Sequence, residues 1–370
     1  MINARAAARA HIGGVERWAR EMAERLPRLR PEAYLVARPP RGLAHRAGHG
    51  WEQVALPLLA RRRGASLIYC PANLGPMAGP GNVVLLHDVA ALRHPEWYSR
   101  TYAAWQGRMV PLVARRALAV ATVSAYSRSQ IAETLDIAPE RIAVIAGGVD
   151  ERFRPGAAPD ARHALGLERP YALTLSTRYP RKNQAALTEA ARRLGERGID
   201  LVAAGGERGY MRAEPPVPGV RALGYVDDDL LPGLFAGARA FVLASRGEGF
   251  GLPCLEAMSS GVPVVAADSG ALPETCGDAA LLVDPGDSAA IADALDLATS
   301  DEGVRERLHS AGLGQTGLAF RRAVRAADRH GRLPEADAAP AHAGARPRAG
   351  EHHAGVSGGP RDELRGSSGR

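Results

Sequence analysis

Two glutamates, Glu248 and Glu256, stand on either side of a short glycine-rich segment. An apolar run at residues 239–244 precedes the segment, and Pro253 occupies a position where the first turn of a helix accepts proline, so the pattern predicts a strand, a turn and a helix. The amides of the turn would face outward at the positive end of the helix dipole, which favours a diphosphate without a metal ion. The residues that carry these amides are Gly249, Phe250, Gly251 and Leu252.

The two carboxylates indicate what else such a ligand would contain. Glu256, one turn into the predicted helix, can accept two hydrogen bonds from a ribose diol. Glu248 can reach the hydroxyls of a sugar attached to the diphosphate. The pattern therefore favours a nucleotide-linked sugar, although a tight strand-to-helix turn with two solvated glutamates explains the same spacing without any ligand.

A diphosphate that is bound without a metal ion needs cationic side chains as well as backbone amides. Lys182 is the single lysine among the 47 basic residues of the chain, and it follows a predicted strand at residues 171–176. Arg178 and Arg181 lie in the same segment. Lys182 with either Arg178 or Arg181 suits the diphosphate. The alternative is a solvated loop that caps a helix starting near Asn183.

His87 and Asp88 follow another predicted strand, at residues 82–86. The carboxyl ends of parallel strands meet at one edge of a sheet, where ligands bind, so these residues and the cations are expected at one rim. A core histidine that is satisfied by its neighbour is the alternative for His87. The segment 93–102, rich in aromatic and cationic side chains, could line a groove for the acceptor of such a sugar.

The elements that must position these residues alternate along the chain. Apolar runs alternate with helical patterns through residues 1–150 and again through about 168–300, the rhythm of parallel sheets covered on both faces. We therefore predict an α/β fold with two Rossmann-like, doubly wound domains that face each other across a cleft. The predicted strands are 34–37, 66–70, 82–86, 119–123 and 142–145, then 171–176, 199–204, 239–244, 263–267 and 280–283.

A Pro/Gly-rich linker at 153–159 divides the two halves. The expected domains are residues 1–152 and 160–312, followed by an atypical tail at 313–370. The tail is rich in Arg, Ala, Gly and Pro, a composition that predicts disorder. At the other end, the chain begins only a few residues before Gly13 and Gly14, so either the start is misassigned or a central strand is short.

Composition excludes several classes of protein. The 370 residues are 46% hydrophobic and 24% charged, which is ordinary for globular domains, and no run approaches the length of a membrane span. The absence of a signal-peptide pattern favours the cytoplasm. With 5% aromatic residues, the net charge of +7 gives little support for nucleic-acid binding.

Metal and disulfide chemistry also find little support. Cys70, Cys254 and Cys276 lack the spacing of metal ligands and give no disulfide framework. The acidic run at 227–229 precedes a predicted helix at 230–238, so it is interpreted as a helix N-cap and not as a metal site.

Residues 224–268, continued by 270–274, resemble the donor domain of the retaining family 4 glycosyltransferases, which have the GT-B architecture. The resemblance is specific because it runs over dozens of residues. It extends over roughly residues 3–300, with further matches at 13–17, 87–88, 122–124, 145–150 and 180–183.

The resemblance implies a role for each candidate residue. Glu256 would hold the ribose, and Glu248 and His87 would act at the transferring sugar as the catalytic pair. Gly13 and Gly14 would let the backbone of the first domain approach the phosphates.

Lys182 with an arginine would hold the diphosphate. In the family this arginine usually follows a glycine, whereas Ser176 and Thr177 precede Arg178 here. Arg178 and Arg181 therefore both remain candidates.

The activity implied is a retaining, metal-independent hexosyltransferase without a cofactor. The donor would be a GDP-sugar or a UDP-sugar, with mannose favoured by the segment 180–183, and the acceptor a hydroxyl of a glycan, a lipid-linked saccharide or a metabolite. Retention without a protein nucleophile means that the acceptor attacks the face that the diphosphate leaves, while a phosphate oxygen takes the proton.

One further expectation concerns a partner. The basic runs at 61–63 and 115–116 could meet anionic lipid, which would place the protein at the inner membrane surface.

The alternative function is a nucleotide-sugar-binding protein of the same fold without turnover. A nucleotide-sugar epimerase would need a different set of acids.

Overall fold

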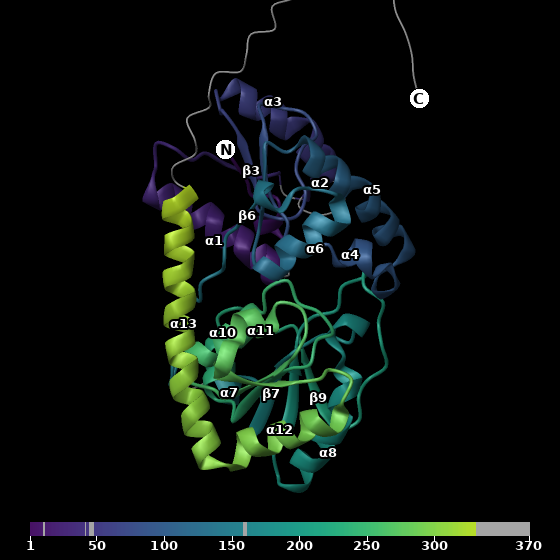
Figure 1. Cartoon of the computed structure of the whole chain (residues 1–370), viewed down its shortest axis with the longest axis vertical. Coiled ribbons are helices and arrows are strands. Elements are labelled where there is room, and N and C mark those ends of the chain that lie inside the picture. The colour runs from purple at the N-terminus through teal and green to yellow at the C-terminus, as the bar shows by residue number, and fades with distance from the viewer. Residues whose placement is uncertain (10–11, 41, 44–47, 158–160, 331–370) are drawn as a thin grey trace, which may run out of the picture. The chain divides into compact units, whose positions relative to one another are not determined.

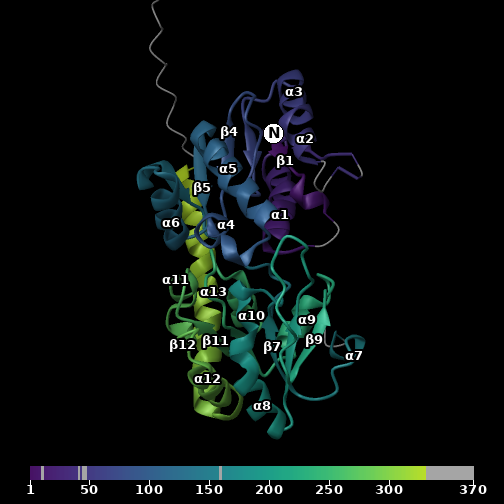
Figure 2. The same cartoon turned by 90° about the vertical axis from the view of Figure 1, so that its right-hand side faces the viewer.

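The structure is a computed structural model that describes residues 1–9, 12–40, 42–43, 48–157 and 161–330, with side chains described up to residue 317. Met1–His330 form one compact unit. It contains two six-stranded parallel sheets, each covered by helices (Figures 1 and 2). We refer to the sheet β1–β6 with its helices as the first lobe and to the sheet β7–β12 with its helices as the second lobe.

The first lobe has the strand order β2-β1-β3-β4-β5-β6. All its pairings are parallel, as the crossover helices require. Its strands are β1 Ile2–Asn3, β2 Val36–Ala37, β3 Ile68–Cys70, β4 Asn82–Leu85, β5 Ala119–Thr122 and β6 Ile142–Val144. Its helices are α1 Gly14–Leu29, α2 Gly48–Gln53, α3 Ala55–Arg62, α4 Ala90–Arg93, α5 Arg100–Arg116 and α6 Ala125–Leu135.

Strand β1 is the short central strand that the sequence left as one of two alternatives. Ile2 pairs with Val36 on one side and with Tyr69 on the other, although β1 has only two residues. Ile2 is fully buried, and the amino group of Met1 donates to the Leu67 carbonyl at 2.8 Å. The short strand still pairs on both sides because its neighbours β2 and β3 are themselves only two and three residues long.

The second lobe has the order β12-β11-β10-β7-β8-β9, again parallel throughout. Its strands are β7 Tyr171–Leu175, β8 Asp200–Ala204, β9 Val220–Gly224, β10 Ala240–Leu243, β11 Val264–Ala267 and β12 Ala280–Val283. Its helices are α7 Ala161–Ala164, α8 Thr188–Glu196, α9 Leu231–Ala236, α10 Leu252–Ser259, α11 Leu272–Cys276, α12 Ser288–Ser300 and α13 Glu302–His330. The edge strand β9 was not predicted, because its side chains are mostly exposed and form no apolar run.

The central strands are apolar on both faces, which explains their continuous hydrophobic runs. In β7, Leu173 packs in the core cluster with Phe241, whereas Ala172 packs in the cluster on the opposite face with Val242. Successive side chains of a strand point to opposite faces, so both faces must be covered by helices. The three cysteines, Cys70, Cys254 and Cys276, are buried and free.

Part of the expected disordered tail is helical. Helix α13 continues through residue 313, the predicted boundary, to His330, and it packs against α10 and α12 (Figure 1). Gln315 donates to the Thr275 carbonyl at 2.8 Å, and Leu308 is buried. Ala, Arg and Leu favour helix, so the prediction was wrong for residues 313–330; residues 331–370 lie outside the described residues.

Candidate functional site

The predicted turn between the two glutamates has the expected form. It leads into α10, whose N-cap residue Gly251 has a positive φ of 92°. A Cβ atom on Gly251 would also lie 2.5 Å from Cδ2 of Leu272, so a larger residue does not fit. In the described part of the chain, no hydrogen bond is donated by the amide groups at positions 249–252. The turn therefore has free donors at the start of a helix, as a diphosphate would need.

The same turn is fastened to the first lobe. Ser124 and Ser127, at the start of α6, donate from their hydroxyls to the Gly249 carbonyl at 2.7 and 2.9 Å. The Phe250 ring packs against the first-lobe cluster that contains Val123. A Cβ on Gly249 would lie 2.5 Å from the His87 carbonyl oxygen, so the close approach of the two lobes requires glycine.

Glu248 is held by two cations of its own lobe. Lys182 donates to one carboxylate oxygen at 2.7 Å, and Arg181 donates to the other at 3.0 Å. Burial raises the pKa of Glu248, but the charges of Lys182 and Arg181 outweigh burial and lower this pKa to about 2. Glu248 is thus an ionised hydrogen-bond acceptor at neutral pH.

Arg181 also links the two lobes. Its guanidinium donates to the Gly247 carbonyl at 2.8 Å and to Asp88 of the first lobe at 3.0 Å. Arg178, in contrast, pairs with Glu207 at the surface. Of the two candidate arginines, Arg181 lies beside Lys182 and Glu248.

Glu256 faces the first lobe and is engaged there. Its side chain is 3% exposed, and it accepts a hydrogen bond from Arg17 of α1. Arg17 also binds Asp228 at 2.5 Å, and Arg152 binds the other oxygen of Asp228 at 2.5 Å. Burial raises the pKa of Glu256, and the nearby charge of Asp228 raises it further, because Arg17 and Arg152 offset only part of these effects.

Gly13 and Gly14 lie at the start of α1, beside a third ion pair between the lobes. Arg208, which follows β8, donates to both carboxylate oxygens of Glu16 at 3.0 Å. A Cβ on Gly13 would lie 2.4 Å from the Arg208 guanidinium, whereas one on Gly14 would meet no atom within 4 Å. Gly13 is therefore the position where the backbone approaches the second lobe.

His87 lies at the end of β4 and is uncharged at neutral pH. Its Nε2 lies 3.0 Å from the Pro71 carbonyl, so Nε2 carries the proton and Nδ1 is the acceptor. Burial lowers the pKa of His87. The ring makes an edge contact with Trp18, with the ring centres 5.7 Å apart.

The structure thus brings most of the candidate residues to one boundary between the lobes. Arg178 is the exception, since it pairs with Glu207. The roles of all these residues in binding stay predictions. Sequence reasoning missed Arg17 and Arg208 as partners of site residues.

The position of Arg17 next to Glu16, in the segment that begins with Gly13 and Gly14, was the available signal for Arg17.

The interpretation of residues 227–229 as a helix cap was wrong. The N-cap of α9 is Leu230, without a side-chain cap, and the carboxylate of Asp228 binds arginines instead. In the described ranges, no group of His, Cys, Asp or Glu side chains is arranged to hold a metal ion, and no helix is long and apolar enough to cross a membrane.

Two family models match the chain, one in each lobe. Residues 12–153 match the model described as Glycosyltransferase Family 4. Residues 169–301 match the model described as Glycosyl transferases group 1.

Curated relatives match over part of their length. The chain is 33% identical over 257 residues to the O-antigen chain mannosyltransferase B of Escherichia coli, covering 63% of this chain and 65% of the relative. It is 36% identical over 176 residues to a GDP-mannose-dependent alpha-(1-6)-phosphatidylinositol monomannoside mannosyltransferase of Mycobacterium tuberculosis, covering 42% of this chain and 45% of the relative. The matched region thus spans less than two thirds of either relative.

Solved structures share the fold over nearly the whole chain. The sucrose-phosphate synthase of Thermosynechococcus elongatus matches with a TM-score of 0.67 at 18% identity, covering 90% of this chain and 98% of that one. Anabaena HepE in complex with UDP-glucose matches with a TM-score of 0.65 at 21% identity, covering 90% and 99%. Together with the two parallel sheets, these likenesses confirm the predicted two-domain GT-B fold.

Proposed function

The chain belongs to the family 4 glycosyltransferases of GT-B architecture, in a branch with mannosyltransferase relatives, and on this premise we propose that it moves a hexose from a nucleoside-diphosphate donor to an acceptor hydroxyl. One observation carries the proposal. The free amides of the turn at 249–252 lie between Glu248, with its two cations, and the buried Glu256. The sugar, the diphosphate and the ribose of a nucleotide-sugar thus each have a complementary group near one helix start.

In this proposal the diphosphate binds the turn amides together with Lys182 and Arg181. These two cations now pair with Glu248 and Asp88, so the phosphates compete with carboxylates for them. The cations would stabilise the charge that develops on the leaving diphosphate. The ribose diol takes the carboxylate of Glu256.

The sugar lies between Glu248 and His87. Ionised Glu248 accepts hydrogen bonds from the sugar hydroxyls, and its low pKa makes it a poor proton donor. The Nδ1 atom of His87 can accept a further hydrogen bond from a sugar hydroxyl. Neither group needs to become a nucleophile, which supports a retaining reaction in which the acceptor hydroxyl attacks on the side of the leaving group and passes its proton to a phosphate oxygen.

For the donor we propose GDP-mannose before any UDP-sugar. The reasons are the segment Pro180–Lys182 followed by Asn183, and the two mannosyltransferase relatives, one of which is named as GDP-mannose-dependent. The bound UDP-glucose of Anabaena HepE keeps a UDP-sugar as the second choice. We propose that the reaction needs no metal ion, because the amides and cations supply the positive charge.

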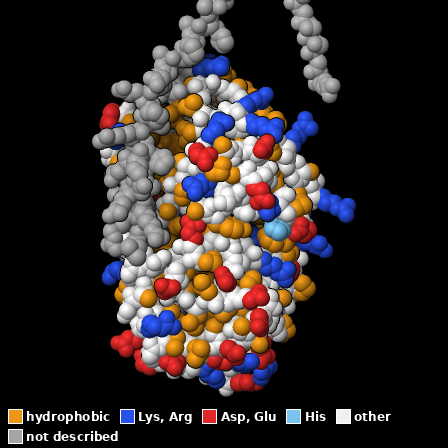
Figure 3. Space-filling view, in the orientation of Figure 1, with side chains coloured by type: hydrophobic (Ala, Val, Ile, Leu, Met, Phe, Trp, Pro, Cys, Tyr) orange, Lys and Arg blue, Asp and Glu red, His pale blue; other side chains and the backbone are white. Residues whose placement is uncertain are grey.

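We also propose a peripheral contact with an anionic membrane through the end of the first lobe at α3. Val54 and Leu58 are 63% and 48% exposed there, and the arginines at 61–63 are exposed at the end of α3. Leu118 is 69% exposed, and the arginines at 115–116 are exposed at the end of α5. Figure 3 shows basic and hydrophobic side chains side by side at that end. Each basic residue near an anionic surface contributes about 1 kcal/mol, so binding to anionic vesicles should weaken sharply with salt.

A thermal-shift screen with GDP, UDP, ADP and their sugar conjugates tests the donor site, since a ligand stabilises the folded state by mass action. We expect GDP and GDP-mannose to raise the melting temperature most, without added metal. A transfer assay with labelled donor then tests turnover. Binding without release of labelled sugar to any acceptor or to water would favour a binding protein, and equal response to every nucleotide would contradict a selective site.

A further inference from the structure

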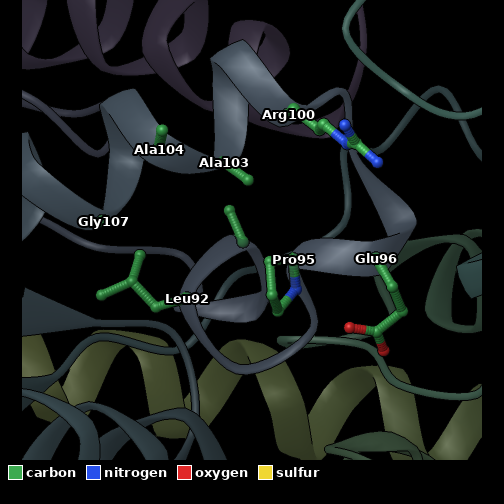
Figure 4. A pocket seen from close by; sticks show the side chains of 8 residues that line it. Leu92, Pro95, Glu96, Arg100, Ala103, Ala104 and Gly107 are labelled. Carbon is green, nitrogen blue, oxygen red and sulfur yellow. The ribbon is translucent and has the colours of Figure 1, made fainter.

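A cavity of about 620 Å³ opens beside α4 and α5 in the first lobe (Figure 4). Its volume is in the range of small-ligand sites, which is roughly 300 to 1,000 Å³. Most of its wall is apolar, and its alanines and its glycine contribute at most a methyl group each. The residues that form this wall are Ala91, Leu92, Pro95, Ala103, Ala104 and Gly107.

Two side chains of opposite charge complete the wall. Figure 4 shows the guanidinium of Arg100 and the carboxylate of Glu96 on the same side of the cavity. Glu96 accepts a hydrogen bond from His94 at 3.2 Å, and Arg100 forms no ion pair within the described ranges. The pair offers both donors and acceptors with no net charge. Such a pair over an apolar floor suits a neutral, hydroxyl-rich ligand better than an anion or a long apolar chain.

The cavity lies next to the donor side of the site. Trp97, between Glu96 and the start of α5, is buried with its ring toward the second lobe. A Cβ on Gly247 would lie 3.9 Å from Cη2 of this ring. Gly247 directly precedes Glu248, and its carbonyl is bound by Arg181. The side chain of Trp97 therefore lies between the cavity wall and the residues proposed to hold the donor sugar.

We propose that this cavity binds the sugars of a neutral oligosaccharide acceptor next to the residue that is extended. The proposal rests on the proposed function and narrows the acceptor to a glycan. The apolar floor packs against the C–H faces of the sugar rings. Glu96 and Arg100 bind the ring hydroxyls, and longer acceptors bind better because they fill more of the cavity.

Gly107 offers a way to block the cavity without a clash. A Cβ there would meet no atom within 4 Å, and glycine inside a helix is less stable than other residues. Gly107→Leu should therefore fold while filling the floor. Gly195→Leu is the matched control, since Gly195 lies in α8 of the second lobe and also has open space around it.

The experiment measures transfer from GDP-mannose to α-linked manno-oligosaccharides of increasing length, together with GDP binding, in the full chain. We expect the wild type and Gly195→Leu to show a falling acceptor KM as the oligosaccharide lengthens. Gly107→Leu should lose this trend and show an acceptor KM at least about tenfold higher for the longest acceptor, with GDP affinity unchanged. Arg100→Ala and Glu96→Gln should raise the same KM without changing GDP binding.

The outcomes separate the two proposals. No GDP or GDP-mannose binding in the wild type would overturn the proposed function itself. Normal donor binding and transfer, with an acceptor KM that ignores both length and Gly107→Leu, would overturn the acceptor cavity alone. A strong preference for a phosphorylated or lipid-linked acceptor that depends on Arg100 would also overturn it, because the ligand would then be anionic.

Discussion

Arg17 of the first lobe donates a hydrogen bond to the carboxylate of Glu256 in the second, so a cation occupies the group proposed to hold the ribose. The contact is buried: the Arg17 side chain is 15% exposed and that of Glu256 is 3% exposed. A ribose diol that binds both oxygens of this carboxylate competes with Arg17 for Oε1. Donor binding and contact between the lobes therefore compete for one carboxylate.

Arg17→Met should reveal this competition. The substitution leaves Glu256 buried without its cation, which should lower the free energy of unfolding of the ligand-free protein by about 3 kcal/mol. GDP should then raise the melting temperature by more than it does in the wild type, because the ribose meets a carboxylate without a competitor. A thermal melt with and without GDP measures both effects.

The control for this variant lies on the same helix. Arg25 is 55% exposed and also pairs with acidic residues, so Arg25→Met should change neither quantity appreciably. A smaller GDP shift in Arg17→Met than in the wild type would mean that Arg17 assists donor binding, contrary to the competition.

A methyl group at Gly249 should disturb the turn more than one at Gly247. The added Cβ of Gly249→Ala would lie 2.5 Å from the His87 carbonyl oxygen, whereas the Cβ of Gly247→Ala has its nearest neighbour at 3.9 Å. We expect Gly249→Ala to raise the GDP dissociation constant at least about tenfold and to lower stability, since the turn must move away from the first lobe. Calorimetric titration of both variants with GDP checks this prediction. Equal GDP affinities of the two variants would contradict it, because the lobes could then move apart at the turn without weakening GDP binding.

The low pKa of Glu248 gives stability a defined dependence on pH. The folded-state pKa of about 2 lies below the ordinary value of 4.5, so the folded protein binds fewer protons than the unfolded chain between these values. The contribution of Glu248 to the free energy of unfolding is on the order of 3 kcal/mol. It is fully present above about pH 4.5 and is lost as the pH falls toward 2. Chemical denaturation should show a shallower loss of stability with acid in Glu248→Gln than in the wild type. If the free energy of unfolding fell with acid equally in both proteins, Lys182 and Arg181 would not hold this carboxylate in solution.

The sequence predicted what depends on neighbouring residues in the chain. The turn into α10 follows from glycine and proline next to an apolar strand, and most strands were found because both faces of the sheets are buried. The ion pairs between the lobes were not predictable in this way. Arg17 and Glu256 are 239 positions apart, and no local pattern states which arginine will meet which carboxylate after the lobes pack together.

The same limit applies to the arginine that we propose for the diphosphate. Sequence alone left Arg178 and Arg181 open, and the structure places only Arg181 within hydrogen-bond distance of Glu248 and Asp88. Arg178 pairs with Glu207, whose side chain is 61% exposed. The choice depends on how the short helix Pro180–Lys182 turns after β7, which is a tertiary feature.

The two arginines therefore make a matched pair of variants. Arg181→Ala should raise the KM for the donor and lower kcat, together reducing kcat/KM by about a hundredfold or more, because a buried cation that would bind the leaving diphosphate is lost. Arg178→Ala should leave both constants within about twofold, since an exposed ion pair contributes little. Steady-state kinetics with GDP-mannose distinguishes them. The reverse order of effects would require Arg178 to leave Glu207 and reach the phosphates, which would move the diphosphate toward the end of β8 and away from the turn.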